Sequence, residues 1–282
     1  MKNCLIIACL IILTLSGCNQ KKIELGKDAS FKIEKDLAYG DDKEQVMDLY
    51  IPEILPEHAD VFIIIHGGGW RGGRRSQLTS FTFDLMKKFP KSIFVNMDYR
   101  LATTTHFALP NQTDDIKRAI NYLEKKLKIK PKFILLGNSA GGHLSMMYAY
   151  QFDKDKKVKA VINIVGPADL NDPGFKNYVD YTFVEKHLID PKIIGTKTTL
   201  MNFGSPVHWI STTSAPTLSY YGMNDRIVPL SQMKILDSVL NKNNVYHESY
   251  EFSGDHVGWE KDSNAEFLIQ KTDAFLKNVD KK

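Results

Sequence analysis

A serine flanked by glycines lies between an apolar run and a stretch that can form a helix. Residues 136–142 read Leu-Gly-Asn-Ser-Ala-Gly-Gly and contain the pattern Gly-x-Ser-x-Gly. In a strand–turn–helix setting this pattern forces the serine into strained dihedrals, which lift its hydroxyl above the sheet. Gly137 and Gly141 must stay small because the turn brings the backbone and the helix close together. A Gly-Ser turn before a helix is also typical of phosphate-binding loops, but this setting favours a nucleophile, and we predict that Ser139 is that nucleophile.

Three consecutive glycines follow another apolar run. Residues 66–70 read His-Gly-Gly-Gly-Trp and come directly after the run 61–65. Glycines at a strand end leave backbone N–H groups uncovered, and such groups can stabilise a developing oxyanion. A flexible glycine turn is the alternative. We expect His66 to brace this loop through hydrogen bonds and to take no part in the chemistry.

A nucleophilic serine needs a base and an acid beside it. His256 lies in a loop of small residues after the last predicted strand, and Asp225 lies in the turn after the predicted strand 217–221. Because the carboxyl ends of parallel strands meet at one edge of a sheet, we expect both side chains to reach Ser139. The alternative for Asp225 is a turn-capping role.

Other residues of the same types are weaker candidates. His247 begins within a predicted strand, and His208 precedes a turn. Asp255 is next to the predicted base and is expected to be an ordinary loop residue. Residues 98–100, Asp-Tyr-Arg, follow a central strand and are expected to brace the sheet edge. His256 and Asp225 are therefore the predicted base and acid.

Apolar runs that alternate with helical stretches predict the elements that position these residues. Such alternation requires right-handed crossovers and gives a mostly parallel sheet covered by helices on both faces, which is an α/β fold. The first run, 46–51, alternates in polarity and is expected to be an antiparallel strand. The other predicted strands are 61–65, 92–97, 133–136, 158–165, 217–221 and 246–252, and the predicted helices are 77–89, 114–127, 141–152, 231–241 and 265–279.

Residues 169–209 interrupt this alternation. The segment contains prolines, glycines and several aromatic residues, and it is too long for a plain connection. We expect a small, cap-like insertion over the strand ends that lines the substrate site. Its Tyr178 and Tyr181, with Trp70 and Trp259 beside the predicted oxyanion and base loops, could offer flat faces to sugar or phenolic rings. The alternative is that these aromatic side chains pack the insertion onto the domain.

Taken together, these motifs resemble those of the α/β-hydrolase esterases. The similarity is strongest to the branch related to hormone-sensitive lipase and to the Bacteroidetes feruloyl and acetyl esterases, and it runs from about residue 46 to the C-terminus. It implies the α/β-hydrolase fold, a triad in the order Ser, Asp, His, and oxyanion donors at Gly68, Gly69 and Ala140. The motifs that carry the resemblance are residues 66–70, 98–101, 137–143 and 225–229 and His256.

The sequence departs from the family pattern in two places. Residues 103–106, Thr-Thr-Thr-His, replace a proline-rich turn, and the insertion 169–209 carries no recognised signature. In the resembling families, both places lie where the acyl and alcohol pockets form.

The resemblance implies a serine carboxylic-ester hydrolase that works through an acyl-enzyme. His256 takes the Ser139 proton, Ser139 attacks the ester carbonyl, and water then releases the acid. No metal ion or organic cofactor is expected. The expected substrates are short-acyl esters of carbohydrates, acetyl or feruloyl, as small molecules or oligosaccharides. The alternatives are a lipase or a formamidase with the same triad, or a non-catalytic binding protein on this fold.

The first eighteen residues have the pattern of an export signal. A short basic start precedes the apolar run 5–15, which is too short to span a bilayer. The run ends in Leu-Ser-Gly-Cys, which resembles a bacterial lipobox and implies cleavage before Cys18 and a diacylglycerol on its thiol. An ordinary secretory signal is the alternative. The predicted parts are a signal peptide over 1–17, a lipidated tether over 18–30 and an α/β-hydrolase domain over 31–282.

Cysteine usage and charge bear on location and partners. Cys18 would be the only cysteine left after cleavage, which excludes intrachain disulfides and a cysteine nucleophile within the fold. Two or three acyl chains suffice for a stable membrane anchor, and Asn19 after the cysteine favours the outer membrane of a bacterial cell envelope. The formal net charge of +4, with scattered Lys and Arg, predicts no nucleic-acid partner.

Overall fold

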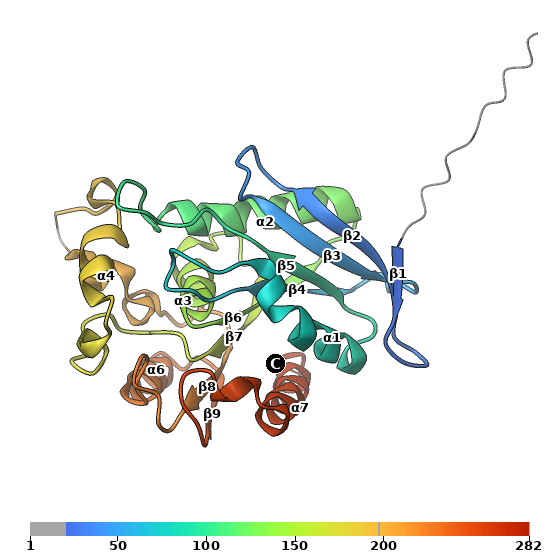
Figure 1. Cartoon of the computed structure of the whole chain (residues 1–282). Helices are drawn as coiled ribbons and strands as arrows, with labels where there is room; N and C mark the ends of the chain where they lie inside the picture. Colours follow the sequence, from blue (N-terminus) through green and yellow to red (C-terminus); the bar gives the residue numbers. More distant parts are fainter. Residues whose placement is uncertain (1–20, 197, 282) are drawn as a thin grey trace, which may run out of the picture.

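The computed structural model describes residues 21–196 and 198–281. Within them the chain forms one sheet in the order β1-β2-β3-β5-β4-β6-β7-β8-β9, with helices on both faces (Figure 1). The six strands β5, β4, β6, β7, β8 and β9 pair in parallel in that order. The pairs β1–β2, β2–β3 and β3–β5 are antiparallel. The strand bounds are β1 Lys21–Glu24, β2 Ser30–Ala38, β3 Val46–Pro52, β4 Asp60–Ile65, β5 Ile93–Met97, β6 Lys132–Asn138, β7 Val158–Ile164, β8 Thr217–Gly222 and β9 His247–Phe252.

The helices that cover the sheet follow the predicted ranges closely. Helix α1 is preceded by a short 3-10 turn, η1, and α3 continues into a π-helical turn, η2. Their bounds are η1 Arg75–Leu78, α1 Thr79–Lys88, α2 Asn111–Leu127, α3 Ala140–Met147, η2 Tyr148–Phe152, α6 Ser231–Lys242 and α7 Asp262–Val279.

The central strand β4 shows why the sequence gives two cores. Successive side chains of a strand point to opposite faces of the sheet. Val61, Ile63 and Ile65 lie in a hydrophobic cluster with α2, α3 and α6, whereas Phe62 and Ile64 lie in a second cluster with α1 and α7. Because both faces are buried, the strand is a continuous apolar run. The predicted α/β fold with its mostly parallel sheet is confirmed, as is the antiparallel strand over 46–51.

The tether predicted over residues 18–30 is wrong for its described part. Residues Lys21–Glu24 form β1 and pair with β2, so the folded domain includes residues before the predicted boundary at 31. Ile23 and Leu25 pack against the cluster beneath α1 and α7. Two apolar side chains in a polar stretch give too weak a periodicity to predict an edge strand. The predicted cleavage and lipidation at Cys18 lie outside the described residues.

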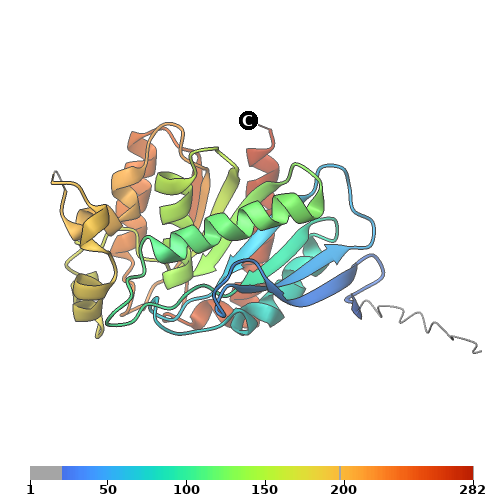
Figure 2. The ribbon, with the colours of Figure 1, turned by 90° about the horizontal axis from the view of Figure 1, so that it is seen from above.

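The segment 169–209 forms a compact group of short helices. Both views place it at the end of the molecule opposite β1 (Figures 1 and 2). Its elements are η3 Phe175–Asn177, α4 Tyr181–His187, η4 Pro191–Ile193, α5 Leu200–Gly204 and η5 Pro206–Trp209. In the part of the chain that the structure describes, no helix combines the length and the apolar character needed to cross a membrane.

Candidate active site

Ser139 occupies a strained turn between β6 and α3. Its φ is 53° and its ψ is −122°, a conformation that residues with a side chain rarely adopt. A Cβ atom on Gly137 would lie 2.3 Å from the carbonyl carbon of Gly141, and a Cβ atom on Gly141 would lie 2.0 Å from the carbonyl oxygen of Ile65. Both distances are far below van der Waals contact, so the prediction that these two glycines must stay small is confirmed.

The structure brings the predicted base and acid to this serine. His256 Nε2 lies 2.9 Å from Ser139 Oγ, and His256 Nδ1 lies 2.7 Å from Asp225 Oδ2. The three residues follow the carboxyl ends of β6, β9 and β8, as expected for ligand sites of parallel sheets. Such a hydrogen-bonded chain is the arrangement by which a base activates a serine. The geometry was predicted; the catalytic roles stay predictions.

Asp225 is fixed by the turn in which it lies. Its Oδ1 accepts the N–H groups of Ile227 at 2.8 Å and Val228 at 2.9 Å, which leaves Oδ2 for His256. The side chain is buried. The turn-capping role that the sequence left as an alternative therefore occurs together with the contact to the base, because a carboxylate has two oxygens.

The weaker candidates lie in other surroundings. Asp255 is exposed, and its side chain accepts the N–H of Val257 at 3.3 Å. His247 starts β9 and its Nδ1 lies 2.9 Å from the carbonyl oxygen of Val245. His208 lies in η5 of the insertion. None of these side chains takes the place of His256 or Asp225.

The glycine loop after β4 lies beside Ser139. Gly68 and Gly69 have φ values of 118° and 59°, and a Cβ atom on Gly68 would lie 2.2 Å from the carbonyl oxygen of Gly72. Within residues 21–196 and 198–281, no protein acceptor takes the backbone N–H of Gly68, Gly69 or Ala140. Unpaired N–H groups beside a nucleophile are what an oxyanion hole requires. The role implied for these three residues stays a prediction.

Two contacts hold the glycine loop in place. Asn138 Oδ1 accepts the N–H of Gly67 at 2.9 Å, which ties the loop to the serine turn. The His66 ring stacks on Tyr99 at a centroid distance of 4.2 Å, and its Nδ1 donates to the carbonyl oxygen of Gly67 at 2.7 Å. Burial lowers the pKa of His66, so the ring is neutral at neutral pH. The expectation that His66 braces this loop is confirmed.

Residues 98–100 join the loop and the sheet edge. Asp98 pairs with Arg75 at the start of η1, and the Tyr99 hydroxyl donates to the carbonyl oxygen of His66 at 2.9 Å. Arg100 Nη2 lies 2.6 Å from Asp115 Oδ1 on α2. These contacts confirm the predicted bracing role.

A buried histidine that the sequence did not single out connects three parts of the site. The Trp70 indole N–H donates to His143 Nδ1 at 3.1 Å, and His143 Nε2 donates to the carbonyl oxygen of Gly204 at 2.7 Å. These two hydrogen bonds connect the glycine loop through α3 to the insertion. Burial lowers the pKa of His143 to about 4, so the ring is neutral and its tautomer is set by the two contacts.

A hollow of about 550 Å³ opens above Ser139. The insertion contributes Tyr178 and Asp180 to its wall, so the expectation that the segment 169–209 lines the site is confirmed. Among the four aromatic side chains considered for substrate binding, Tyr178 lines this hollow, whereas Trp70, Tyr181 and Trp259 are 2%, 8% and 1% exposed. Packing therefore explains those three. The rest of the wall comes from Gly67, Gly68, Gly69, Gln77, Leu78, Asn138, Ile227, His256, Val257 and Glu260.

Tyr178 lies over the glycine loop, and contacts with Asp180 and Arg71 hold this part of the insertion in place. A Cβ atom on Gly69 would lie 3.0 Å from the Tyr178 hydroxyl oxygen, and that hydroxyl lies 3.4 Å from Asp180 Oδ2. Arg71, from the glycine loop, pairs with the same Asp180 oxygen at 2.7 Å and lies over the Phe183 ring at 4.9 Å. Burial raises the pKa of Tyr178, so its hydroxyl stays protonated; it donates to Asp180, and its oxygen can accept a hydrogen bond from a ligand in the hollow.

The described residues contain no group of three or more His, Cys, Asp or Glu side chains that could hold a metal ion.

Comparisons with known proteins agree with this architecture. The family model BD-FAE matches residues 47–240. The chain is 25% identical over 141 residues to neutral cholesterol ester hydrolase 1 of Pongo abelii and 28% identical over 125 residues to kynurenine formamidase avaC of Aspergillus versicolor. These matches cover 45% and 38% of this chain and 34% and 43% of the relatives, so the chain spans less than half the length of either.

Solved structures resemble the chain over most of its length. A truncated carbohydrate esterase from gut microbiota matches with a TM-score of 0.68 and 19% identity, over 91% of this chain and 99% of that one. Esterase B from Lactobacillus rhamnosis, inhibited by a tributyrin phosphonate, matches with a TM-score of 0.69 and 21% identity, over 89% of this chain and 88% of that one. At these identities the likeness shows the shared fold.

Proposed function

The chain belongs to the BD-FAE family of α/β-hydrolase esterases, and from this premise we propose that it is a serine carboxylic-ester hydrolase. Ser139 is the nucleophile, His256 the base and Asp225 the acid that orients the base. The observation that carries the proposal is the hydrogen-bonded chain from Ser139 Oγ through the imidazole to Asp225 Oδ2, at 2.9 and 2.7 Å.

The geometry supports a two-step reaction. His256 Nε2 accepts the Ser139 proton while Oγ attacks the ester carbonyl carbon, and the N–H groups of Gly68, Gly69 and Ala140 stabilise the oxyanion. The Nδ1–H of the base donates to Asp225, which stabilises the imidazolium that forms. The imidazolium protonates the alcohol oxygen, which leaves, and water activated by the same imidazole then releases the acid from the acyl-enzyme.

We further propose short acyl groups, acetyl to butyryl or feruloyl, on a carbohydrate alcohol. The rim of the hollow carries hydrogen-bonding groups, namely the Tyr178 hydroxyl and the Arg71–Asp180 pair, where a lipase would present an apolar entrance. A structural neighbour is described as a carbohydrate esterase, and another carries a tributyrin phosphonate. These likenesses support the choice of substrate.

A formamidase is the second candidate because one relative is described as a kynurenine formamidase. The same triad and oxyanion donors serve amide cleavage of a formyl group. Substrate assays distinguish the two activities.

The experiment compares three substrate sets with one enzyme preparation. They are p-nitrophenyl esters from C2 to C12, acetylated xylo-oligosaccharides and an N-formyl arylamine. We expect the highest kcat/KM among the aryl esters at C2 to C4, together with release of acetate from the sugars. A kcat/KM that climbs to C10 or beyond with no acetate released would contradict the substrate proposal, and turnover of the formamide alone would favour the formamidase.

We also propose that the mature chain is anchored to the bacterial cell envelope through lipid on Cys18, in the outer membrane. The lipobox-like residues 15–18 and the small residues before the cysteine support this location. Its test is given with the predictions for the whole molecule.

A further inference from the structure

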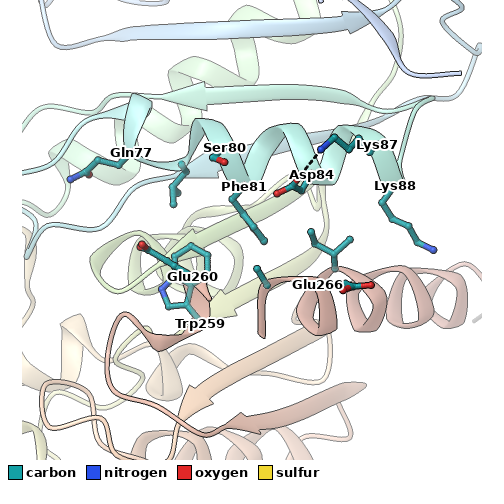
Figure 3. Close-up of a pocket in the computed structure, with 12 residues that line it drawn as sticks. Gln77, Ser80, Phe81, Asp84, Lys87, Lys88, Trp259, Glu260 and Glu266 are labelled. Carbon is teal, nitrogen blue, oxygen red and sulfur yellow. Dashed lines mark hydrogen bonds and ion pairs between the residues drawn. The ribbon is translucent and has the colours of Figure 1, made fainter. Parts of the chain in front are cut away.

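A second hollow lies beside the active site, between α1 and α7. Its volume is about 690 Å³, and it shares Gln77, Leu78 and Glu260 with the hollow above Ser139. Figure 3 shows its two walls, with Ser80, Phe81 and Asp84 on α1 facing Trp259, Glu260 and Glu266. We call it the α1–α7 groove. The shared residues place the two hollows side by side, so a molecule that reaches from Ser139 into this groove must pass Gln77, Leu78 and Glu260.

The floor of the groove is apolar and firmly packed. Phe81 and Trp259 meet edge to face at a centroid distance of 5.3 Å, and Ala265 and Ile269 of α7 complete the floor. The indole N–H of Trp259 has no acceptor within residues 21–196 and 198–281. Because this N–H is buried and Trp259 is 1% exposed, the floor offers a ligand apolar contact and no hydrogen-bond donor.

Polar side chains follow the rim on both walls. Lys87 is paired with Asp84, and Lys88 is paired with Asp273, each at 2.8 Å, so neither ammonium group is left for an anionic ligand. Glu260 and Glu266 are exposed carboxylates that can accept hydrogen bonds from hydroxyl groups. The groove therefore suits a neutral ligand with apolar faces and hydroxylated edges, and it repels acids.

We propose that the α1–α7 groove binds the sugar units of the substrate's alcohol that lie beyond the scissile ester. A pyranose has apolar ring faces for the floor and hydroxyl edges for Gln77, Glu260 and Glu266. A long acyl chain would leave this polar rim without partners. The inference rests on the proposed function, because it names the alcohol on which the esterase acts.

The test fills the groove away from the catalytic residues. Ala265→Trp on α7 places an indole on the groove floor. Ala274→Trp is the matched control, because Ala274 is exposed on the same helix and does not line the groove. Each variant is assayed on p-nitrophenyl acetate, on acetylated xylose and on acetylated xylo-oligosaccharides, and on p-nitrophenyl decanoate.

In the wild type we expect kcat/KM to rise at least about tenfold from the acetylated monosaccharide to the oligosaccharides. Ala265→Trp should remove this rise and leave p-nitrophenyl acetate hydrolysis within about twofold, and Ala274→Trp should retain the rise. A wild type with no such rise, or an Ala265→Trp enzyme that keeps it, overturns the inference. So does a selective loss on the decanoate, which would make the groove an acyl site.

The failure of the proposed function has a different signature. If the wild type hydrolyses no ester, p-nitrophenyl acetate included, the esterase assignment fails and the groove inference fails with it. Hydrolysis of the aryl acetate without preference for longer sugars overturns the groove inference alone. Ser80→Trp, which fills the groove from α1, repeats the test if Ala265→Trp does not fold.

Discussion

Asp225 shows how one side chain meets two requirements. Its Oδ1 is held by two backbone N–H groups, and its Oδ2 receives the Nδ1–H of His256. The carboxylate is therefore placed before the substrate arrives, and the base is held in the tautomer that presents Nε2 to Ser139. Replacing the carboxylate by an amide of the same shape tests the orientation of the base without removing the turn.

We expect Asp225→Asn to lose activity by roughly 10⁴ in kcat, because an amide can present its NH₂ to the imidazole and favour the wrong tautomer. Asp255→Asn is the matched control, since Asp255 is the neighbouring exposed loop residue. Its kcat should stay near that of the wild type. Kinetics on p-nitrophenyl acetate compare the two, and a severe loss in Asp255→Asn with little loss in Asp225→Asn would show that we have named the wrong carboxylate.

His143 makes the stability of the fold depend on pH. Burial lowers its pKa to about 4, whereas an unfolded histidine titrates near 6.5. Between these values the unfolded chain binds a proton that the folded chain does not bind. The free energy of unfolding therefore falls as the pH is lowered from about 6.5, and this contribution levels off below about pH 4.

His143→Gln removes the titrating group and keeps an acceptor for Trp70 and a donor for the Gly204 carbonyl. We expect the wild type to lose about 2 kcal/mol more than this variant between pH 7 and pH 5. Urea unfolding at the two pH values measures the difference. Parallel losses in the two proteins would show that His143 does not cause the pH dependence.

Most of the individual residues of the active site could be predicted from the sequence. Ser139 and Asp225 stand in short motifs after buried strands, and His256 follows the edge strand β9; strand ends fix where such side chains meet. Tyr178 could be named only as one of four aromatic candidates for substrate contact, and His143 only as the last residue of the motif 137–143. The burial of His143 and the position of Tyr178 over Gly69 depend on how the insertion folds back, and no local pattern encodes that contact.

The turn at the end of β6 is the element on which the site depends most. The close approach of β6 and the first turn of α3 leaves no room for a side chain at Gly137, because a Cβ atom there would lie 2.3 Å from the carbonyl carbon of Gly141. We expect Gly137→Ala to lower the free energy of unfolding by about 2 kcal/mol or more, because an added methyl must displace backbone atoms.

Gly195→Ala is the matched control for this turn. No heavy atom lies within 4 Å of a Cβ atom placed on Gly195, so its stability should stay within about 0.5 kcal/mol of the wild type. Chemical denaturation measures both variants. Equal stabilities of Gly137→Ala and the wild type would contradict the packing that we describe.

Elements buried on both faces were the easiest to predict, because their sequences are continuously apolar. The two N-terminal strands, β1 and β2, were missed for the opposite reason. Strand β2, Ser30–Ala38, carries charged side chains on its exposed positions, and β1 has four residues with one partly buried side chain. The insertion was recognised by its length, but the packing of its aromatic residues followed from tertiary contacts alone.

At the scale of the whole molecule the main prediction concerns its location. Residues 1–20 lie outside the described structure, so the anchor depends on the lipobox-like sequence that ends in Cys18. We expect the wild type to fractionate with membranes, because two or more acyl chains give stable anchoring. Cys18→Ser should give an unprocessed or released enzyme with unchanged activity on p-nitrophenyl acetate.

Membrane fractionation and the mass of the N-terminal peptide measure the anchor. A wild-type enzyme found wholly in the soluble periplasmic fraction, with no lipid on Cys18, would contradict the lipid anchor. The catalytic proposal would be unaffected, since the site is built from residues that lie between positions 66 and 260.

The central claim is that Ser139 is the nucleophile of an ester hydrolase. The most direct measurement is the reaction of the enzyme with diethyl p-nitrophenyl phosphate, followed by mass spectrometry and assay of p-nitrophenyl acetate hydrolysis. We expect one diethylphosphoryl group on Ser139, loss of activity in step with labelling, and neither label nor turnover in a Ser139→Ala protein with an unchanged melting temperature. A wild type that hydrolyses the ester without being labelled at Ser139, or a Ser139→Ala protein that keeps more than about a tenth of the activity, would contradict the claim, because the loss of a triad nucleophile costs far more than that.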